Sequence, residues 1–459
     1  MSGKAKSAGI AGGVPSIFNA AGRKIDRQDT YHDLFSNYPK GRLDTMGRVV
    51  FHIDVNNAYL SWESAWRLQH GEKTDLRDRL AVVGGDEEKR HGIVLAKSIP
   101  AKRLGVKTGE TLMEARRKAP GLIVVPPHYD LYMTCSGAMR DILAEYSPAV
   151  QQFSIDEMFL EYTGAQRLYG PPVKAANDLR ERIKGELGFT VNIGISENKL
   201  LAKMASEFQK PDRVHTLWDR EIPGKMWPLP IGELFMVGMR TEIKLRRRGI
   251  ETIGQLAAME PDTLNAWFGK YGVMLWQYAN GRECSGVGSW TPVKGIGNSA
   301  TIPFDVSDAD EAERILLALS ETVALRLRAH LSCARLVSVH GRTQDFRGFQ
   351  RQHMFSAPTD HTGEIHRRTV RLLHEIWEGQ PLRHMGVRVS ELVSNDFWQC
   401  SLFESERGRE RALDRAVDTV RGRYGPGALF RSCFLHAGIA PLMGGVSGED
   451  EYPMMKSLL

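Results

Sequence analysis

The apolar residues in the first half of the chain follow two periods, one typical of buried strands and one typical of amphipathic helices. Short apolar runs, most of them bounded by Gly or Pro, predict strands at residues 48–55, 80–85, 92–96, 121–127 and 189–196. Apolar residues at helical spacing predict helices at residues 56–69, about 130–146 and 198–209. The run AVQQFSIDEMFLEYTG at residues 149–164 predicts one further strand, with two acids near its middle. The irregular alternation predicts an α+β sheet with helices on one face.

A different pattern begins after residue 217. Residues 227–259 contain VGM, a basic helix, RGI and TIGQL. The Gly- and Ser-rich stretch at residues 284–300 has few large apolar side chains and predicts an interdomain linker. Beyond it the pattern predicts strands at 301–306, 334–343 and 384–393, and amphipathic helices at 312–331 and 365–379. Together these elements predict a βαβ-type sheet domain with basic edges.

Composition narrows the class of protein. The 459 residues are 42% hydrophobic and 25% charged, which is ordinary for about two to four soluble domains. The net charge of +6 mildly favours a polyanionic partner. Five scattered cysteines without a CxxC pair predict reduced thiols in a cytoplasmic protein, not a disulfide framework or a zinc site. No apolar run approaches the ~18 residues of a membrane span.

The N-terminal residues carry no such pattern. The first 25 residues contain no acid, and the chain stays polar without a clear period up to Arg48. We predict a disordered or loosely packed extension over residues 1–47, with a targeting peptide as the alternative.

Asp156 and Glu157 stand side by side inside an apolar run. A buried carboxylate without a partner costs several kcal/mol, so acids in such a position are normally paired or metal-bound. Adjacent strand residues point to opposite faces, so the two acids share a site only at a bulge, a strand end or a hairpin. Asp54 ends an independent strand. Three acids converging from neighbouring strands would form a hard oxygen site for Mg²⁺, as in two-metal phosphoryl transfer. The alternative is a salt-bridged surface hairpin with Asp156 as a turn residue.

Three longer motifs favour the metal site, because together they resemble a known family. The motifs are HIDVNNAYLSWE, SIDEMFLE and GISENKLLAKMASEFQKPD. They resemble motifs of the Y family of translesion DNA polymerases of the DinB type, in the family's order and at family-like intervals. The likeness extends from about Arg48 to His436 and is strongest before residue 215.

The resemblance implies an α+β, multidomain right-hand polymerase with a palm, small fingers, a helical helix–hairpin–helix thumb and an α/β little finger. The expected ranges are 1–47 for the extension, 48–56 and 128–217 for the palm, 57–127 for the fingers, 218–285 for the thumb, 286–296 for a linker, 297–437 for the DNA-binding little finger and 438–459 for a C-terminal tail.

The resemblance assigns the family's site roles to residues at the matching positions of the three motifs. Asp54, Asp156 and Glu157 would be the metal-binding acids, and the backbone carbonyl of Val55 would help hold the nucleotide-side ion. Glu157 would lie nearest the primer 3′-hydroxyl as the catalytic acid. Tyr59 falls on the steric-gate position, where its ring would clash with a 2′-hydroxyl. Without the flanking motif, Tyr59 would be read as a core aromatic of a helix.

The resemblance also assigns several basic side chains to the binding of the triphosphate. Lys210 would contact the incoming triphosphate, and Lys102 and Arg103 lie in the fingers motif SIPAKR. Family members often carry Tyr and Arg where this chain has Ile99 and Lys102. A weaker triphosphate grip is expected unless Arg103 compensates.

Further residues extend or depart from the family pattern. Lys199 and Lys203 match family positions that serve the fold as much as the substrate. Asn56 replaces a frequent Asp, and Arg213 a usual Gly. In the thumb, a triplet of arginines beside the hairpin would contact DNA phosphates, although such a triplet alone is usually a solvated face. The triplet is Arg246, Arg247 and Arg248.

These features imply a low-fidelity, template-directed DNA polymerase that extends a primer with dNTPs past damaged bases, uses two Mg²⁺ ions and acts as a monomer. One alternative is a non-catalytic DNA-binding subunit with a vestigial palm, which the presence of all three acids disfavours. A metal-dependent nuclease is disfavoured by Tyr59 and Lys210.

The pentapeptide QCSLF precedes a charged run and resembles the peptide with which bacterial polymerases dock on the sliding clamp. Gln399 would supply hydrogen bonds, and Leu402 and Phe403 would enter an apolar pocket. The alternative is that Leu402 and Phe403 pack on the little finger.

Overall fold

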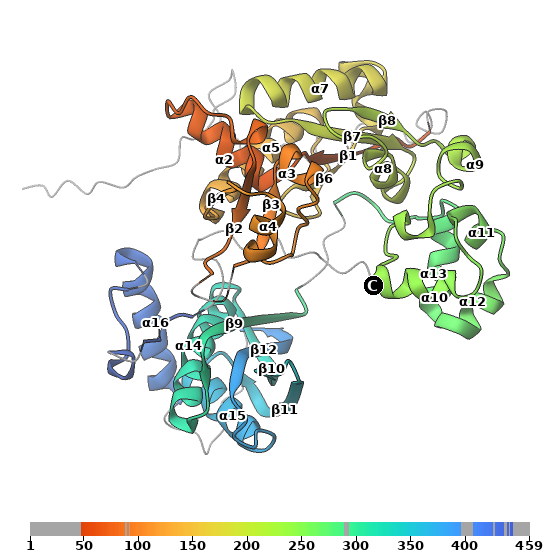
Figure 1. Cartoon of the computed structure of the whole chain (residues 1–459). Helices are drawn as coiled ribbons and strands as arrows, with labels where there is room; N and C mark the ends of the chain where they lie inside the picture. Colours follow the sequence, from red (N-terminus) through yellow and green to blue (C-terminus); the bar gives the residue numbers. More distant parts are fainter. Residues whose placement is uncertain are drawn as a thin grey trace, which may run out of the picture.

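The computed structural model of the chain describes residues 47–87, 90, 92–288, 293–395, 407–425, 427–435, 438–439 and 441–443. Its helices and strands form three sheets and a helical segment (Figure 1). The N-terminal extension before residue 47, the QCSLF motif and the tail beyond residue 443 lie outside the described residues. Among the described helices, none combines the length and the apolarity that crossing a bilayer requires.

A five-stranded sheet occupies the range expected for the palm and is called the palm sheet here. Its strand order is β5-β6-β1-β7-β8, with every neighbouring pair antiparallel except β7 and β8. The strands are β1 (Val50–Val55), β5 (Val150–Gln152), β6 (Glu157–Glu161), β7 (Val191–Ser196) and β8 (Val214–Thr216).

The single strand predicted over residues 149–164 is wrong. β5 ends at Gln152 and β6 begins at Glu157, and residues 153–156 turn the chain between them. The backbone N–H groups of Phe153 and Ser154 both donate to the Glu157 carbonyl, at 2.9 and 3.1 Å. Phe153 and Ile155 are buried, so this turn has the apolar composition of a strand. The turn is the strand end that allows two adjacent acids to share a site.

Helices cover both faces of the palm sheet, so the expectation of helices on one face is wrong. One face packs on α2 (Ala58–Gln69), α5 (Tyr129–Tyr146) and α7 (Pro172–Leu187). The helix α8 (Lys199–Ser206) packs against β1 and β7 from the other face. Gly194 makes this approach possible, because a Cβ atom there would lie 1.9 Å from the Ala202 carbonyl oxygen.

We expect Gly194→Ala to lower the free energy of unfolding by at least about 1–3 kcal/mol, because the added methyl group pushes α8 away from the sheet. Urea denaturation measures the change. Gly185→Ala is the matched control, since a Cβ atom at Gly185 of α7 would meet nothing within 4 Å. The control should be neutral or slightly stabilising. Equal destabilisation by both changes would contradict the close approach.

The fingers range holds a three-stranded sheet in the order β3-β2-β4, which confirms the three predicted strands. They are β2 (Ala81–Gly84), β3 (Val94–Lys97) and β4 (Ile123–Val125). The helices α3 (Ile99–Arg103) and α4 (Leu112–Lys118) lie in the same range, and α6 (Gln166–Tyr169) lies in the palm. The Ser98 side chain caps α3 by accepting the Ala101 N–H.

The thumb range is helical. The helix α10 (Met239–Arg246) and the short helix α11 (Ile253–Ala257) flank a turn that contains Gly249 with a φ of +79°. A positive φ is the conformation that glycine adopts without strain, so the RGI signal marks this turn. The remaining thumb helices are α9 (Ile222–Lys225), α12 (Pro261–Phe268) and α13 (Lys270–Ala279).

The C-terminal sheet, called the little-finger sheet here, has the order β11-β10-β12-β9 with all neighbours antiparallel. Its strands are β9 (Gly295–Val306), β10 (Ser332–Thr343), β11 (Gly348–Thr359) and β12 (Leu382–Ser394). The helices α14 (Ala309–Ala329) and α15 (Thr362–His374) pack on one face. The sequence pattern missed β11, because this edge strand is exposed along most of its length and lacks apolar alternation. β9 begins at Gly295, inside the range expected for the linker.

The helix α16 (Arg407–Tyr424) lies at the outer side of the little finger (Figure 1) and is attached to it by ion pairs. The Asp414 carboxylate accepts the Thr362 N–H at 2.9 Å and lies 2.8 Å from His361 Nδ1 and 3.3 Å from Arg328 Nη1. Burial would raise the pKa of Asp414, but these donors outweigh it and hold the pKa below its ordinary 3.8. Asp414 therefore stabilises the fold when it is ionised.

Asp414→Asn is expected to lower the free energy of unfolding by about 2 kcal/mol at neutral pH. Because the folded-state pKa is depressed, this stability is present above the unfolded pKa and is lost as the pH falls through the folded value. The difference between the two proteins should therefore shrink in acid denaturation series below the ordinary pKa of 3.8. Asp141→Asn is the control, because the Asp141 side chain is 75% exposed and should contribute nothing measurable. A constant difference at all pH values would contradict the ionic role.

Candidate active site

Asp54 and Glu157 occupy opposed positions on neighbouring strands. β1 and β6 pair with Asp54 directly across from Glu157. The next residue, Val55, donates its N–H to the Asp156 carbonyl at 3.0 Å. The structure therefore brings the ends of β1 and β6, with all three predicted acids, to one edge of the palm sheet.

Asp156 lies in the turn just before β6 and is held locally. Its Oδ1 atom accepts the Ser154 hydroxyl at 2.5 Å. Burial, followed by the nearby charge of Glu157, raises the pKa of Asp156 even though the Ser154 hydroxyl lowers it. Nearby positive charge therefore does not fully compensate the Asp156 carboxylate.

Two lysines compensate the other two acids. Lys203 of α8 pairs with Glu157, and Lys210 Nζ lies 3.1 Å from Asp54 Oδ1 and 2.9 Å from Glu207 Oε1. Burial nevertheless raises the pKa of Asp54 to about 7, with a further contribution from Glu157. The site can therefore accept more positive charge than these lysines supply.

His52 is a site residue that the sequence analysis missed. Its buried ring places Nε2 3.2 Å from Glu157 Oε2 and Nδ1 2.8 Å from the Ser206 hydroxyl of α8. Burial, and then the charge of Lys203, lowers the pKa of His52 to about 4, so the ring is neutral at neutral pH. Burial alone would raise the pKa of Glu157, but His52 and Lys203 outweigh it and hold that pKa at about 2. The signal in the sequence is the spacing of His52 two positions before Asp54 on β1, which places both side chains on the same face of the strand.

The donor set fits Mg²⁺, whereas the present side-chain positions do not yet form a chelate. Three carboxylates and the Val55 carbonyl are the oxygen ligands that Mg²⁺ prefers. Among the described residues, no three acidic, His or Cys side chains meet at the spacing of metal ligands. The acids instead contact Lys203, Lys210 and the Ser154 hydroxyl.

Tyr59 lies on α2, one turn beyond the end of β1, and is half-buried. Its ring stacks on Tyr132 with centroids 4.5 Å apart, and its edge approaches Tyr129 at 6.1 Å. The ring is thus held from one side by α5. The core-aromatic interpretation accounts for these contacts, and the steric-gate role of Tyr59 stays a prediction.

The predicted triphosphate cations come from two elements. Lys102 and Arg103 are exposed at the end of α3, and Ile99, the first residue of this helix, is also exposed. Lys210 instead lies on the palm side, at Asp54. Lys199 donates to Gln151 at 3.2 Å, which is a structural contact.

Asn56, the departure from a frequent Asp, ties the loops around the site together. Its Oδ1 atom accepts the Asp212 N–H at 2.9 Å and the Thr190 hydroxyl at 3.0 Å. Its Nδ2 atom donates to Asn192 at 3.2 Å. These contacts join segments about a hundred or more residues apart, so no local sequence signal could have shown them.

The three thumb arginines differ in their contacts. Arg246 pairs with Glu242 at 2.9 Å within α10. Arg248 donates to the Lys244 carbonyl, and its guanidinium lies 5.0 Å from the Trp267 ring centroid. Arg247 is exposed, with no side-chain partner among the described residues. Arg247 is therefore the most available of the three for a DNA phosphate.

Comparisons with known proteins agree with this architecture. The impB/mucB/samB family matches residues 53–207, and the C-terminal domain of the same family matches residues 293–402. A Y-family DNA polymerase chimera, Dbh-Dpo4(243-245)-Dbh, superposes with a TM-score of 0.65 at 20% identity, covering 76% of this chain and all of that chain. The insertion ternary complex of Dbh DNA polymerase superposes with a TM-score of 0.53 over the same share of this chain. The fold is that of a Y-family DNA polymerase.

Sequence relatives narrow the class. The chain is 42% identical to DNA polymerase IV of Clostridium acetobutylicum over 392 residues, which cover 85% of this chain and 99% of the relative. It is 38% identical to DNA polymerase IV 2 of Bacillus subtilis over 399 residues, which cover 85% and 95% of the two chains. The chain belongs to the impB/mucB/samB family of Y-family DNA polymerases, whose matched relatives are named DNA polymerase IV.

Proposed function

We propose that the chain is a DNA-directed DNA polymerase that adds dNTPs to a primer 3′ end at Asp54, Asp156 and Glu157, and acts in translesion synthesis. The observation that supports this most is the juxtaposition of Asp54 and Glu157 across paired strands, with Asp156 in the adjoining turn. Family membership supports the polymerase over a non-catalytic subunit.

The three acids and the Val55 carbonyl would hold two Mg²⁺ ions. Bound there, the ions supply Lewis-acid stabilisation of the attacking and leaving oxygens. Lys203 and Lys210 keep Glu157 and Asp54 compensated when the ions are not bound. Lys210, released from Asp54, would then be free to approach the triphosphate from the palm, while Lys102 and Arg103 approach it from the fingers.

Sugar choice and DNA grip would come from other elements. Tyr59, backed by Tyr132, would exclude a 2′-hydroxyl. The thumb hairpin and the little finger would hold the duplex through its phosphates, with affinity that falls as salt rises. We propose that the protein works as a monomer in the cytoplasm.

Primer extension with the purified chain, Mg²⁺ and dNTPs separates the three candidate activities. Growth of the primer supports the polymerase. Shortening of the primer would show a nuclease, and a mobility shift without either would show a DNA-binding subunit.

We also propose that QCSLF docks on a sliding clamp through Gln399, Leu402 and Phe403, which rests on the sequence resemblance alone. Tethering raises the effective concentration of the enzyme at the primer end. Leu402→Ala with Phe403→Ala should therefore abolish stimulation by a loaded clamp and leave clamp-free extension unchanged. Stimulation that survives both changes would contradict the motif.

A further inference from the structure

The face of the little-finger sheet away from the helices carries four basic side chains in a compact group. Val337 and Val339 of β10 and Val387 of β12 enter the core beneath α14 and α15, so the residues between them point to the opposite, open face. Strand pairing places Arg342 opposite His384, His340 opposite Gly386, and Ser338 opposite Arg388. The group of His340, Arg342, His384 and Arg388 is called the open-face cluster.

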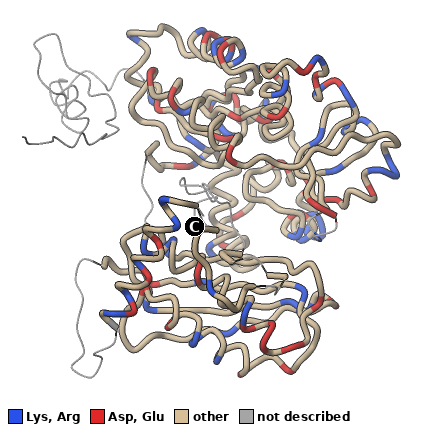
Figure 2. The backbone as a smooth tube through the Cα atoms, turned by 90° about the vertical axis from the view of Figure 1, so that its left-hand side faces the viewer, with Lys and Arg blue, Asp and Glu red and all other residues tan. Residues whose placement is uncertain are grey.

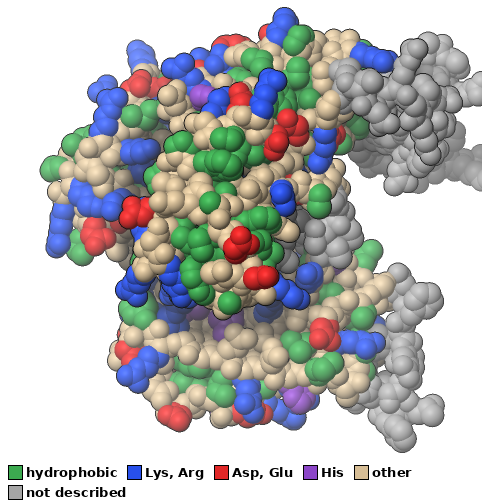
Figure 3. Space-filling model, turned by 90° about the vertical axis from the view of Figure 1, so that its right-hand side faces the viewer, with side chains coloured by type: hydrophobic (Ala, Val, Ile, Leu, Met, Phe, Trp, Pro, Cys, Tyr) green, Lys and Arg blue, Asp and Glu red, His purple; other side chains and the backbone are tan. Residues whose placement is uncertain are grey.

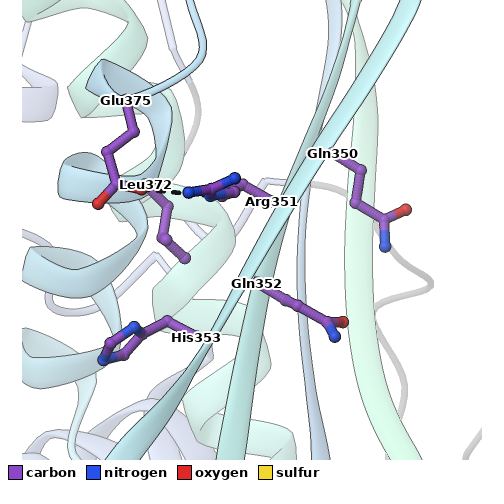
Figure 4. A pocket seen from close by; sticks show the side chains of 6 residues that line it. All are labelled: Gln350, Arg351, Gln352, His353, Leu372 and Glu375. Atoms are coloured by element: carbon purple, nitrogen blue, oxygen red, sulfur yellow. Dashed lines mark hydrogen bonds and ion pairs between the residues drawn. The ribbon is translucent and has the colours of Figure 1, made fainter.

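The neighbours of the open-face cluster are uncharged. On β11, Gln350 pairs with His340 and Gln352 with Ser338. Figure 4 shows that Gln350 and Gln352 point away from Arg351 and His353, which turn toward α15 beside a hollow of about 470 Å³.

The β9 side of the cluster is equally uncharged. Gly297, Ser299 and Thr301 pair with Arg388, Gly386 and His384. The positions paired with the cluster therefore carry no acid. Asp305, further along β9, is the nearest acid on that strand and pairs with Arg90 at 2.7 Å. Elsewhere along the chain, Lys and Arg are interspersed with Asp and Glu (Figure 2).

The two histidines are close together and each contacts a neighbouring strand. Their ring centroids lie 5.9 Å apart. The His340 ring lies across Gly386, where a Cβ atom would come within 2.2 Å of the ring. His384 Nδ1 lies 3.2 Å from the Thr301 hydroxyl. Both rings are half-buried.

This arrangement disfavours the charged form of both rings when no anion is present. Burial lowers the pKa of His340, and Arg342 and Arg388 lower it further. Burial also lowers the pKa of His384, followed by the effects of His340 and Arg342. An anion on the open face would reverse the effect of the arginines, because a nearby negative charge favours the protonated ring.

We propose that the open-face cluster is a phosphodiester-binding site at which duplex DNA binding is coupled to proton uptake by His340 and His384. The inference rests on the proposed function, which brings duplex DNA to the little finger. Figure 3 shows a hollow between the little finger and the rest of the molecule, with Lys, Arg and His side chains along it. A duplex in that hollow would present two rows of phosphates, one of which the open-face cluster would bind.

The direction of the pH dependence follows from the protonation of the two histidines in the free protein and in the DNA complex. The histidines are neutral in the free protein at neutral pH and gain protons in the complex, so affinity for DNA rises as the pH falls. Each proton taken up contributes up to about tenfold in affinity per pH unit between the free and bound pKa values. Above both values the coupling vanishes.

The test is the dissociation constant of a primer–template duplex, measured by fluorescence anisotropy at constant salt from about pH 8 to about pH 6. The wild-type chain should bind roughly tenfold more tightly at the lower pH. His340→Gln with His384→Gln should flatten this dependence. His384→Gln alone should retain part of the slope, which keeps the test open if the double variant folds poorly.

His374→Gln is the matched control. His374 lies on α15, on the helical side of the sheet, with Nε2 2.7 Å from Glu313 Oε1. It should keep the wild-type slope. A pH-independent wild type, or a double variant that keeps the full slope, overturns the coupling. Primer extension at about pH 8 by the wild type and by the double variant tests the proposed function separately. Failure of the wild type to bind DNA at every pH overturns both the coupling and the proposed function.

Discussion

Primer extension by a Glu157→Gln variant is expected to fall on the order of a thousandfold or more, while affinity for primer–template DNA stays within about twofold. The change keeps the shape of the side chain and removes its charge. Metal charge acts mainly in the transition state, whereas the thumb and the little finger supply ground-state affinity. Single-turnover extension and anisotropy on the same duplex measure the two quantities.

Glu161→Gln is the matched control for this variant. Glu161 lies on the same strand, β6, four positions further along, and pairs with Arg48 at 3.0 Å instead of with a site lysine. The control should extend primers at nearly the wild-type rate. Retained extension by Glu157→Gln, or an equal loss in Glu161→Gln, would place the metal site elsewhere.

Tyr59→Ala is expected to raise the ratio of ribonucleotide to deoxynucleotide incorporation by roughly 100-fold. Removing the ring removes a clash, so the ratio changes because the wrong substrate improves, while deoxynucleotide use is partly retained. Tyr59→Phe should keep the wild-type ratio, because the ring and not the hydroxyl forms the barrier. The measurement is kcat/KM for matched ribo- and deoxynucleoside triphosphates.

Tyr169→Ala controls for the loss of a half-buried, stacked tyrosine elsewhere in the palm. Tyr169 stacks on Tyr146 with centroids 4.4 Å apart, as Tyr59 stacks on Tyr132. The control should leave the ratio unchanged even if it lowers stability. If Tyr59→Ala also leaves the ratio unchanged, Tyr59 is only a core aromatic of α2.

The sequence alone predicted those parts of the site that lie within a single motif. The strand before Asp54 and the helix that begins at Ala58 follow from apolar periods, and both formed as predicted. The turn before Glu157 did not, because Phe153 and Ile155 are buried for tertiary reasons and give the turn the composition of a strand. Periodicity alone does not distinguish a buried turn from a buried strand.

Contacts between residues far apart in the chain could not be predicted from the sequence. His52 meets Glu157 across 105 positions, and Asn56 meets Asp212 across 156. Gly194 has no special φ, and only the approach of α8 explains it. The edge strand β11 was missed because one partner strand and exposed faces leave no apolar alternation.

Single-nucleotide insertion tests the polymerase account most directly. Each of the four dNTPs is offered, with Mg²⁺, opposite each of the four template bases, and the rate of primer growth is measured for every combination. The account predicts that the complementary nucleotide is added fastest on every template, with misinsertions detectable because the site is tolerant. Addition of the same nucleotide regardless of the template, or no addition on any template, would contradict it.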